Sequence, residues 1–306
     1  DEPFGDLLCI PAYALAKKAR EQLTVVLTGD GADEILFGYL HQKVSFLRNK
    51  YQKYFKSKSL NGVLSAMTSC VPTGLFNLFF NYPDKFKWRE KIKLSQTINS
   101  ADNFGTFYEN FTSCFTKEDK ANLYSKEFRS KSDRMKISRE IQNDFDGFSG
   151  FTSMSQLSLL DLQYWIPFSV IYRLDKLNMA NAVETRSPFL DYRVVEFALN
   201  LEDRGKYCNN RSKVILRDAI GKMYPRRLQE AGKQAFYMPI THQHKNIFMK
   251  TIKDTLTEDN IRKRNLFDYK YIEDLLKFAN TESMLVNRQL FCLTMLELWF
   301  QEYMDK

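Results

Sequence analysis

A strand, a tight turn and a helix are expected in succession in the stretch Leu23-Thr-Val-Val-Leu-Thr-Gly-Asp-Gly-Ala-Asp-Glu34. The aliphatic and β-branched run 23–28 is typical of a fully buried strand in a parallel sheet. The Gly-Asp-Gly sequence 29–31 ends that strand, and the acidic residues that follow favour a helix N-terminus at Ala32. In α/β folds, this succession places ligands at the carboxyl end of the strand.

The remainder of the chain has mainly helical patterns. Apolar residues at helical spacing, separated by breaks rich in glycine, proline, asparagine and serine, cover 41–147, 156–182, 192–223 and 245–306. Because one strand cannot form a parallel sheet, we expect further strands from a segment upstream of Asp1 or from a partner chain. The sequence therefore predicts an α/β fold that is mostly helical and contains a truncated parallel sheet.

The composition excludes several classes of protein. The 306 residues carry a formal net charge of +8, and 44% of them are apolar, as in ordinary globular proteins. The longest apolar run, 70–82, is interrupted by proline and glycine and is shorter than the roughly 20 residues of a membrane helix. No signal peptide is readable, so we expect a cytoplasmic protein without a membrane partner. The five cysteines lack Cys-x-x-Cys or metal-ligand spacing, which predicts reduced thiols.

A basic stretch with interleaved aromatic residues lies between His41 and Leu60. Its six basic residues and lack of acidic ones are compatible with a nucleic-acid-binding surface. The apolar groups at 44, 47, 51, 54 and 55 nevertheless follow helical spacing. We therefore favour an amphipathic helix whose basic side chains face water, and we expect no nucleic-acid partner.

The glycine turn is the first candidate site. Gly29 and Gly31 permit positive φ angles and a close approach of a ligand to the backbone, and the free N–H groups of a helix start attract anions. Asp30, Asp33 and Glu34 add carboxylates, which suit a Mg²⁺ ion shared with phosphate oxygens. The same acids would also stabilise a helix dipole without any catalytic role, and spacing alone does not separate the two interpretations.

Charged residues crowd a second segment, 173–191. Two internal ion pairs are the favoured interpretation there, Arg173 with Asp175 and Glu184 with Arg186. Buried charges require either a partner or a ligand, so ligand binding is the alternative.

Lys233 is a third candidate, because it follows Gly232 in a loop that leads to Pro239. A lysine in such a loop can reach a phosphate or a developing oxyanion. Taken singly, however, it has the pattern of a solvated surface lysine. Its assignment therefore depends on the rest of the chain.

Several motifs occur in a defined order along the sequence. They are Asp1-Glu-Pro-Phe4, Leu27-Thr-Gly-Asp-Gly-Ala-Asp-Glu34, Phe37-Gly-Tyr39, Asp161-Leu-Gln-Tyr-Trp-Ile-Pro167, Arg173-Leu-Asp-Lys-Leu-Asn-Met-Ala180, Val183-Glu-Thr-Arg-Ser-Pro-Phe-Leu-Asp191, Lys233-Gln-Ala-Phe236 and Leu293-Thr-Met-Leu-Glu-Leu-Trp299. In this order they resemble the synthetase domain of the glutamine-dependent asparagine synthetase family. The matching motifs span nearly the whole chain.

The resemblance implies a fold and a reaction. The implied fold is a single ATP-pyrophosphatase-like domain over 1–306, of the adenine nucleotide alpha hydrolase type. In the implied reaction, ATP adenylates a carboxylate with release of pyrophosphate, and ammonia then attacks the acyl-adenylate. ATP and Mg²⁺ are the implied ligands, and aspartate or a related acid is the implied substrate.

The resemblance also implies roles for particular residues. Asp33 matches a Mg²⁺ ligand, and Asp30 matches an acid that faces the substrates and acts as general base in some members. Lys233 matches the lysine that neutralises charge on the adenylate. The remaining implied nucleotide-binding residues are Gly29, Gly31 and Arg186.

Two parts of the family pattern are expected outside residues 1–306. Family enzymes carry a Ser-Gly-Gly-x-Asp-Ser loop that cradles pyrophosphate and an N-terminal cysteine glutaminase domain that makes ammonia. We therefore expect an upstream segment or a partner chain to supply both, and a non-catalytic subunit derived from the family is the alternative. In addition, Leu36-Phe37-Gly38 replaces one glycine of the usual Phe-Gly-Gly-Tyr, which is expected to add bulk and alter the substrate fit.

Overall fold

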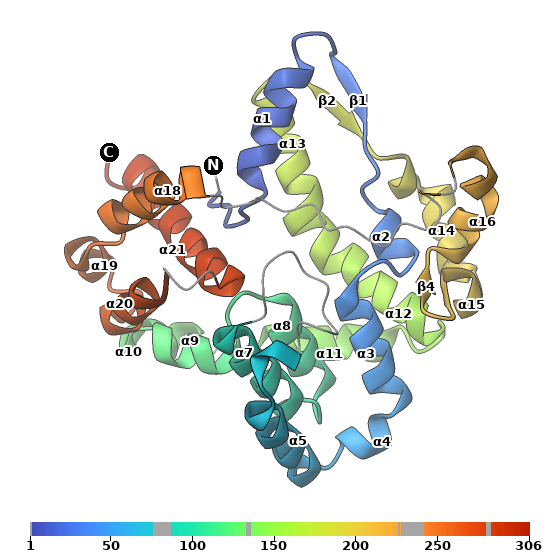
Figure 1. The fold of residues 1–306 in the computed structure, drawn as a ribbon, viewed down its shortest axis with the longest axis horizontal. Coiled ribbons are helices and arrows are strands. Elements are labelled where there is room, and N and C mark those ends of the chain that lie inside the picture. Colours follow the sequence, from blue (N-terminus) through green and yellow to red (C-terminus); the bar gives the residue numbers. More distant parts are fainter. Residues whose placement is uncertain (1, 76–86, 133–135, 226, 228–241, 280–282) are drawn as a thin grey trace. The chain divides into compact units, whose positions relative to one another are not determined.

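The computed structural model describes residues 2–75, 87–132, 136–225, 227, 242–279 and 283–306 (Figure 1). Their contacts divide the chain into two compact units, each built from segments far apart in the sequence. One, the helical unit, consists of Asp1–Leu7, Gln52–Gln142 and Pro239–Lys306. The other, the turn unit, consists of Leu8–Tyr51 and Asn143–Met238.

The turn unit contains the expected parallel strand. The expectation that its neighbour would come from an upstream segment or a partner chain is wrong, because residues Glu184–Arg186 of this chain pair with it. β1 (Val25–Leu27) pairs in parallel with β2 (Glu184–Arg186), and α1 (Cys9–Ala19) lies beside α13 (Tyr172–Met179) next to these strands (Figure 1). A second, antiparallel pair joins β3 (Tyr207–Cys208) to β4 (Arg211–Ser212). The prediction of a mostly helical α/β chain with a small parallel sheet is confirmed.

The prediction that the first strand is fully buried is wrong. Val25 and Leu27 are exposed, Leu27 by 73%, and only Val26 is half-buried. Among the described residues, β1 has β2 as its single strand neighbour. Aliphatic and β-branched composition indicates a strand, but it does not reveal whether other elements of the same chain cover that strand.

Helices make up most of the turn unit. They are α2 (Ala32–Ile35), α3 (Leu40–Lys50), α12 (Ser153–Leu160), α14 (Tyr192–Asn200), α15 (Asp203–Lys206) and α16 (Val214–Ile220), with short 3₁₀ turns at Pro188–Leu190 and Gly221–Met223. A π-helical segment, Asp161–Ile171, joins α12 to α13. Pro167 lies inside it, and a residue without an N–H group is a common cause of such irregular helix. A small apolar core forms around Ile35, Leu36 and Ala198.

α3 buries a polar face rather than the expected apolar one. Gln42, Ser45 and Arg48 are its buried residues, whereas Leu47 is exposed. The predicted single helix over 41–60 is also divided, since α3 ends at Lys50 and α4 (Gln52–Phe55) and α5 (Lys58–Cys70) follow. Hydrophobic spacing assigned the wrong face because a buried polar side chain is tolerated where it is hydrogen-bonded, as Gln42 is to Asp161 and to the Glu34 carbonyl.

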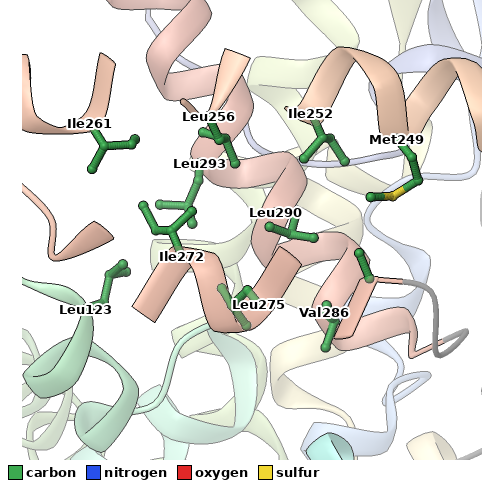
Figure 2. Close-up of a cluster of buried hydrophobic side chains, with 11 residues drawn as sticks. Leu123, Met249, Ile252, Leu256, Ile261, Ile272, Leu275, Val286, Leu290 and Leu293 are labelled. Carbon is green, nitrogen blue, oxygen red and sulfur yellow. The ribbon is translucent and has the colours of Figure 1, made fainter. Parts of the chain in front are cut away.

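Among the described residues, the helical unit contains an aliphatic core formed mainly by its C-terminal helices. Its helices are α4, α5, α7 (Trp88–Asn99), α8 (Phe104–Thr112), α9 (Lys117–Leu123), α10 (Lys126–Ser132), α18 (His242–Thr255), α19 (Glu258–Arg264), α20 (Tyr269–Phe278) and α21 (Met284–Tyr303), while α11 (Ile137–Gly147) begins in this unit and ends in the turn unit. Figure 2 shows side chains of the core meeting between α18, α20 and α21, among them Ile252, Ile272 and Leu290. No helix in the described part of the chain is both long and apolar enough to cross a membrane.

Candidate functional site

The Gly-Asp-Gly turn begins at the carboxyl end of β1 and beside that of β2. The Thr28 N–H donates a hydrogen bond to the Arg186 carbonyl at 2.9 Å. The hydroxyl oxygens of Thr28 and Ser187 lie 2.9 Å apart in a second hydrogen bond. Because the strands are parallel, their carboxyl ends meet at one edge, where α/β folds bind ligands.

The two glycines of the turn serve different purposes. Gly31 has a φ of +95°, and a Cβ there would lie 2.5 Å from Cδ2 of Leu190. Only glycine fits this backbone without strain. Gly29 is exposed, and no atom lies within 4 Å of the position of a Cβ. The backbone at Gly29 is therefore sterically open to a ligand.

The three acidic side chains of the turn do not converge. Glu34 is only 1% exposed and accepts a hydrogen bond from the Tyr39 hydroxyl at 2.8 Å. Asp33 instead lies beside Lys213, with 3.0 Å between its Oδ1 and the lysine Nζ, and its side chain is 28% exposed. Within the described ranges, no group of three or more acidic, histidine or cysteine side chains is placed to hold a metal. The structure therefore removes Glu34 from the acids that spacing suggested for a shared cation.

The residues after α2 pack closely against Asp33. The Gly38 N–H donates to the Asp33 carbonyl at 2.7 Å, and a Cβ on Gly38 would lie 1.7 Å from Asp33 Oδ1. Phe37 adopts a φ of 63°, and its fully buried ring packs against Phe46 and Tyr207 at centroid distances of 6.0 and 5.9 Å. The side chain that replaces a glycine of the motif is thus accommodated in the core of the turn unit.

A buried polar cluster lies behind the turn, made of Glu34, Tyr39, His41, Gln42 and Asp161. The two carboxylate oxygens of Asp161, which is fully buried, contact His41 Nε2 at 2.9 Å and Gln42 Nε2 at 2.7 Å. The Gln42 amide also donates to the Glu34 carbonyl at 2.9 Å. The rings of Tyr39 and His41 stack with 5.1 Å between centroids. This polar cluster connects α2 and α3 to the start of the π-helical segment.

Burial dominates the ionisation of the polar cluster. It raises the pKa of Glu34 above the usual 4.5, while the hydrogen bond from Tyr39 opposes that shift and the charge of Asp161 adds to it. Burial also raises the pKa of Tyr39, and the neighbouring Glu34 charge acts in the same direction. Tyr39 therefore remains a protonated hydrogen-bond donor at neutral pH.

Comparison with known proteins decides which family this architecture represents. The model of the asparagine synthase family matches residues 1–301. The chain belongs to the asparagine synthase family.

Curated relatives are similar over different parts of the chain. Glutamine-hydrolysing asparagine synthetase 1 of Bacillus subtilis is 23% identical over 314 residues, which cover 100% of this chain and 45% of that protein. Amidase chyE of Penicillium rubens is 22% identical over 294 residues, which cover 92% of this chain and 42% of that protein. Putative asparagine synthetase 2 of Methanocaldococcus jannaschii is 34% identical over 105 residues, which cover 30% of this chain and 19% of that protein. The chain spans less than half the length of the curated relatives it matches.

Lys213 is a residue of this asparagine synthase turn that sequence analysis missed. It precedes α16 with a φ of 56°, and its N–H donates to the Leu36 carbonyl at 3.1 Å. This backbone contact brings the Lys213 ammonium to the Asp33 carboxylate. In the sequence, Lys213 is one residue of the helical pattern 192–223, and nothing local indicates a contact with a residue so distant in the chain.

The other predicted residues have different outcomes. Arg186 pairs with Glu184 at 2.9 Å, but the two side chains are 65% and 53% exposed, so the expected internal pair between helices is wrong. Both residues lie on β2 at positions i and i+2, which share one face of a strand. Arg173 and Asp175, two apart on α13, point to different helix faces. Lys233 lies outside the described residues, so its role in neutralising charge on the adenylate stays a prediction.

Proposed function

We propose that this chain supplies the acceptor and metal half of a site for ATP-dependent amidation of a carboxylate. The main observation in support is the Gly-Asp-Gly turn at the carboxyl ends of two parallel strands, where Asp33 lies between Lys213 and Gly38. Family membership and the relatives named as asparagine synthetases support this reaction class. Aspartate or a related acid would be the substrate.

The proposed chemistry has two steps. A carboxylate oxygen of the substrate attacks the α-phosphorus of ATP and pyrophosphate leaves; ammonia then attacks the acyl carbon and AMP leaves. Asp30 would act on the incoming nucleophile as a base, and Lys233 would neutralise charge on the adenylate. Gly29, Gly31 and Arg186 would contact the nucleotide.

The residues at the turn fit a divalent cation in a limited way. Asp33 is a partly exposed carboxylate that already lies beside one cationic group, the Lys213 ammonium. Mg²⁺ is commonly held by one or two carboxylates together with phosphate oxygens, so Asp33 would hold the ion together with phosphate oxygens of ATP. When bound, the ion would offset the negative charge that develops as pyrophosphate departs. Lys213 acts as a positioning residue, because it fixes the direction of the Asp33 carboxylate.

The exposed face of β1 supports a second half of the site on another polypeptide segment. Val25 and Leu27 on this strand, and Leu23 just before it, are exposed apolar residues. Short two-stranded pairs are marginal by themselves, and an open strand edge pairs readily with another strand. We propose that an upstream segment or a partner chain with the pyrophosphate loop and the glutaminase pairs here. A non-catalytic subunit that binds a full-length relative would use the same edge.

ATP–pyrophosphate exchange tests the proposal. With aspartate and Mg²⁺, residues 1–306 alone should show no exchange, and exchange should appear when a polypeptide bearing the Ser-Gly-Gly-x-Asp-Ser loop is added. Asp33→Asn and Lys233→Ala should each lower that rate by about 10²-fold, as loss of a preorganised charge does, without a change in melting temperature. The matched control is Glu196→Gln, which alters an exposed acid of α14.

Two outcomes would redirect the assignment. Robust exchange by residues 1–306 alone would disprove the half-site, and a stable complex without exchange would favour the non-catalytic subunit. Leu27→Asp should weaken assembly of the two parts while leaving the melting temperature of the isolated chain unchanged, since Leu27 is exposed. Ile247→Asp, on the exposed surface of α18, is the control that should leave assembly intact.

A further inference from the structure

Two cysteines of the helical unit meet at α21. Cys114 lies in the connection between α8 and α9, and Cys292 lies within α21. The Gln289 amide donates to the Cys114 carbonyl at 3.0 Å, and Gln289 is three residues before Cys292 on the same helix face. The two thiols are close enough for each to shift the pKa of the other, that of Cys114 downward and that of Cys292 upward. Residues distant in sequence thus form a vicinal thiol pair.

Two cationic groups, Lys93 and Arg288, lie near this pair. Lys93 donates hydrogen bonds from Nζ to the carbonyls of Phe111 and Ser113, directly before Cys114. The hydrogen bond with Cys292 lowers the pKa of Cys114, and the charges of Arg288 and Lys93 act in the same direction, against burial and Asp6. Thiolates in electropositive, partly accessible surroundings are the reactive ones, and Cys114 is half-buried.

Cys292 has one proton and two acceptors within reach. Its Sγ lies 2.9 Å from the Gly5 carbonyl oxygen, to which it donates, and Cys114 is the alternative acceptor. Residue 5 packs directly on this sulfur, since a Cβ on Gly5 would lie 2.8 Å from it. The state of Cys292 therefore affects the anchoring of residues 2–7, which lead along the chain into α1.

We propose that Cys114 and Cys292 form a reversible dithiol–disulfide switch whose oxidant is a hydroperoxide. The Cys114 thiolate attacks one peroxide oxygen, the O–O bond breaks, and a sulfenic acid forms while hydroxide leaves and takes up a proton as water. The Cys292 sulfur then attacks the sulfenic sulfur; the S–S bond forms, the S–O bond breaks, and the Cys292 proton leaves with the second water. Two thiols are oxidised by two electrons, hydrogen peroxide is reduced to two waters, and a dithiol reductant reverses the change.

The disulfide would have a structural consequence. It links the connection between α8 and α9 to α21 and removes the S–H group that donates to the Gly5 carbonyl. The backbone of residues 2–7 loses one of its attachments to α21. Amide hydrogen exchange in this segment should therefore become faster, by several-fold or more, when the protein is oxidised.

Peroxide treatment of the reduced protein tests the switch directly. Hydrogen peroxide should lower the intact mass by about 2 Da, as loss of two hydrogens requires. Peptide mapping should find Cys114 linked to Cys292, and dithiothreitol should restore the mass. Cys292→Ser should accumulate a sulfenic acid at Cys114 that dimedone traps, whereas Cys114→Ser should form neither product.

Controls keep the test independent of folding defects. Cys70→Ser and Cys208→Ser change exposed cysteines and should leave the crosslink intact. If Cys114→Ser or Cys292→Ser fails to fold, iodoacetamide labelling of the wild type before and after peroxide still tests the switch. Both thiols of the pair should become protected from alkylation after peroxide. Unchanged labelling of the pair, or a crosslink through another cysteine, would overturn the switch, and unchanged hydrogen exchange of residues 2–7 would overturn its coupling to that segment.

Discussion

The aliphatic core of the helical unit and the polar cluster of the turn unit both contain fully buried side chains, but different forces hold them together. Ile272 and Leu290 in the first are as fully buried as Gln42 and Asp161 in the second (Figure 2). Apolar burial is non-directional, so the core gains free energy from area and shape. Hydrogen bonds are directional, and a lost partner leaves a buried group unsatisfied. The polar cluster therefore fixes the position of the turn, whereas the core supplies stability.

Among the substitutions considered, removal of the Asp161 carboxylate should lower the free energy of unfolding most, because it breaks the polar cluster. Asp161→Ala takes away the acceptor of both Gln42 and His41 in a site without water access. We expect a loss of about 3–5 kcal/mol in the free energy of unfolding, as for other broken buried pairs. Urea unfolding monitored by fluorescence and circular dichroism measures it.

The isosteric variant sharpens that test. Asp161→Asn keeps the side-chain shape but places an amide N–H₂ or a weaker acceptor against the Gln42 amide, so we expect a loss of roughly 1–3 kcal/mol. If Asp161→Asn left the free energy of unfolding unchanged, side-chain shape rather than hydrogen-bond direction would hold the turn.

In the aliphatic core, the cost of a substitution should depend on the size of the new side chain rather than on its hydrogen bonding. Leu290→Ala should cost roughly 2–5 kcal/mol through lost burial and the cavity it leaves. Leu290→Met conserves volume and should cost less than about 1.5 kcal/mol. Both are measured by the same urea unfolding. A Met variant as damaging as the Ala variant would mean that the core is as demanding as the polar cluster.

Lys206 offers a pH test of buried charge in the turn unit. Its side chain is fully buried, its Nζ donates to Ser155 Oγ at 2.6 Å, and burial lowers its pKa from 10.5 to about 8. Between these two values the unfolded chain binds more protons than the folded protein, so stability should rise as the pH rises.

The measurement compares the wild type with Lys206→Met across that window. The free energy of unfolding of the wild type should increase relative to the variant from about pH 8 to about pH 10, because the ammonium becomes neutral in the folded protein first. If the difference in the free energy of unfolding between wild type and variant did not change with pH, the Lys206 ammonium would be solvated in the folded state.

Local features of the fold and of the site could be predicted from the sequence. The run 23–28 and the glycines after it indicate backbone conformation directly, so a parallel strand and the turn at its end were accessible, whereas the pairing of that strand with β2 of the same chain was not foreseen. Gly31 is the sharpest case, because its positive φ excludes other residues. Motif order gave the family, since ordered short matches are rare by chance.

Long-range properties were not accessible. Gln42 and Asp161 look in the sequence like any surface polar residues, and only the fold brings them together in a dry interior. Lys213 reaches Asp33 through a backbone contact that no spacing rule encodes. The exposure of β1 depends on what lies beside it, which the residues of the strand cannot report. These errors share one cause, because burial is a property of the neighbours rather than of the segment.

The smallest expected effect comes from the exposed pair on β2, and it separates a binding role from a structural one. Arg186 and Glu184 are both more than half exposed, and such pairs contribute about 0–1 kcal/mol, so Arg186→Ala and Glu184→Ala should barely shift the melting temperature. If Arg186 contacts the nucleotide, Arg186→Ala should raise the KM for ATP in the assembled enzyme. Glu184→Ala should leave that KM unchanged or lower it, because it frees the guanidinium. Equal effects of both variants on the KM would mean that the pair has only a structural role in the strand and that Arg186 does not contact the nucleotide.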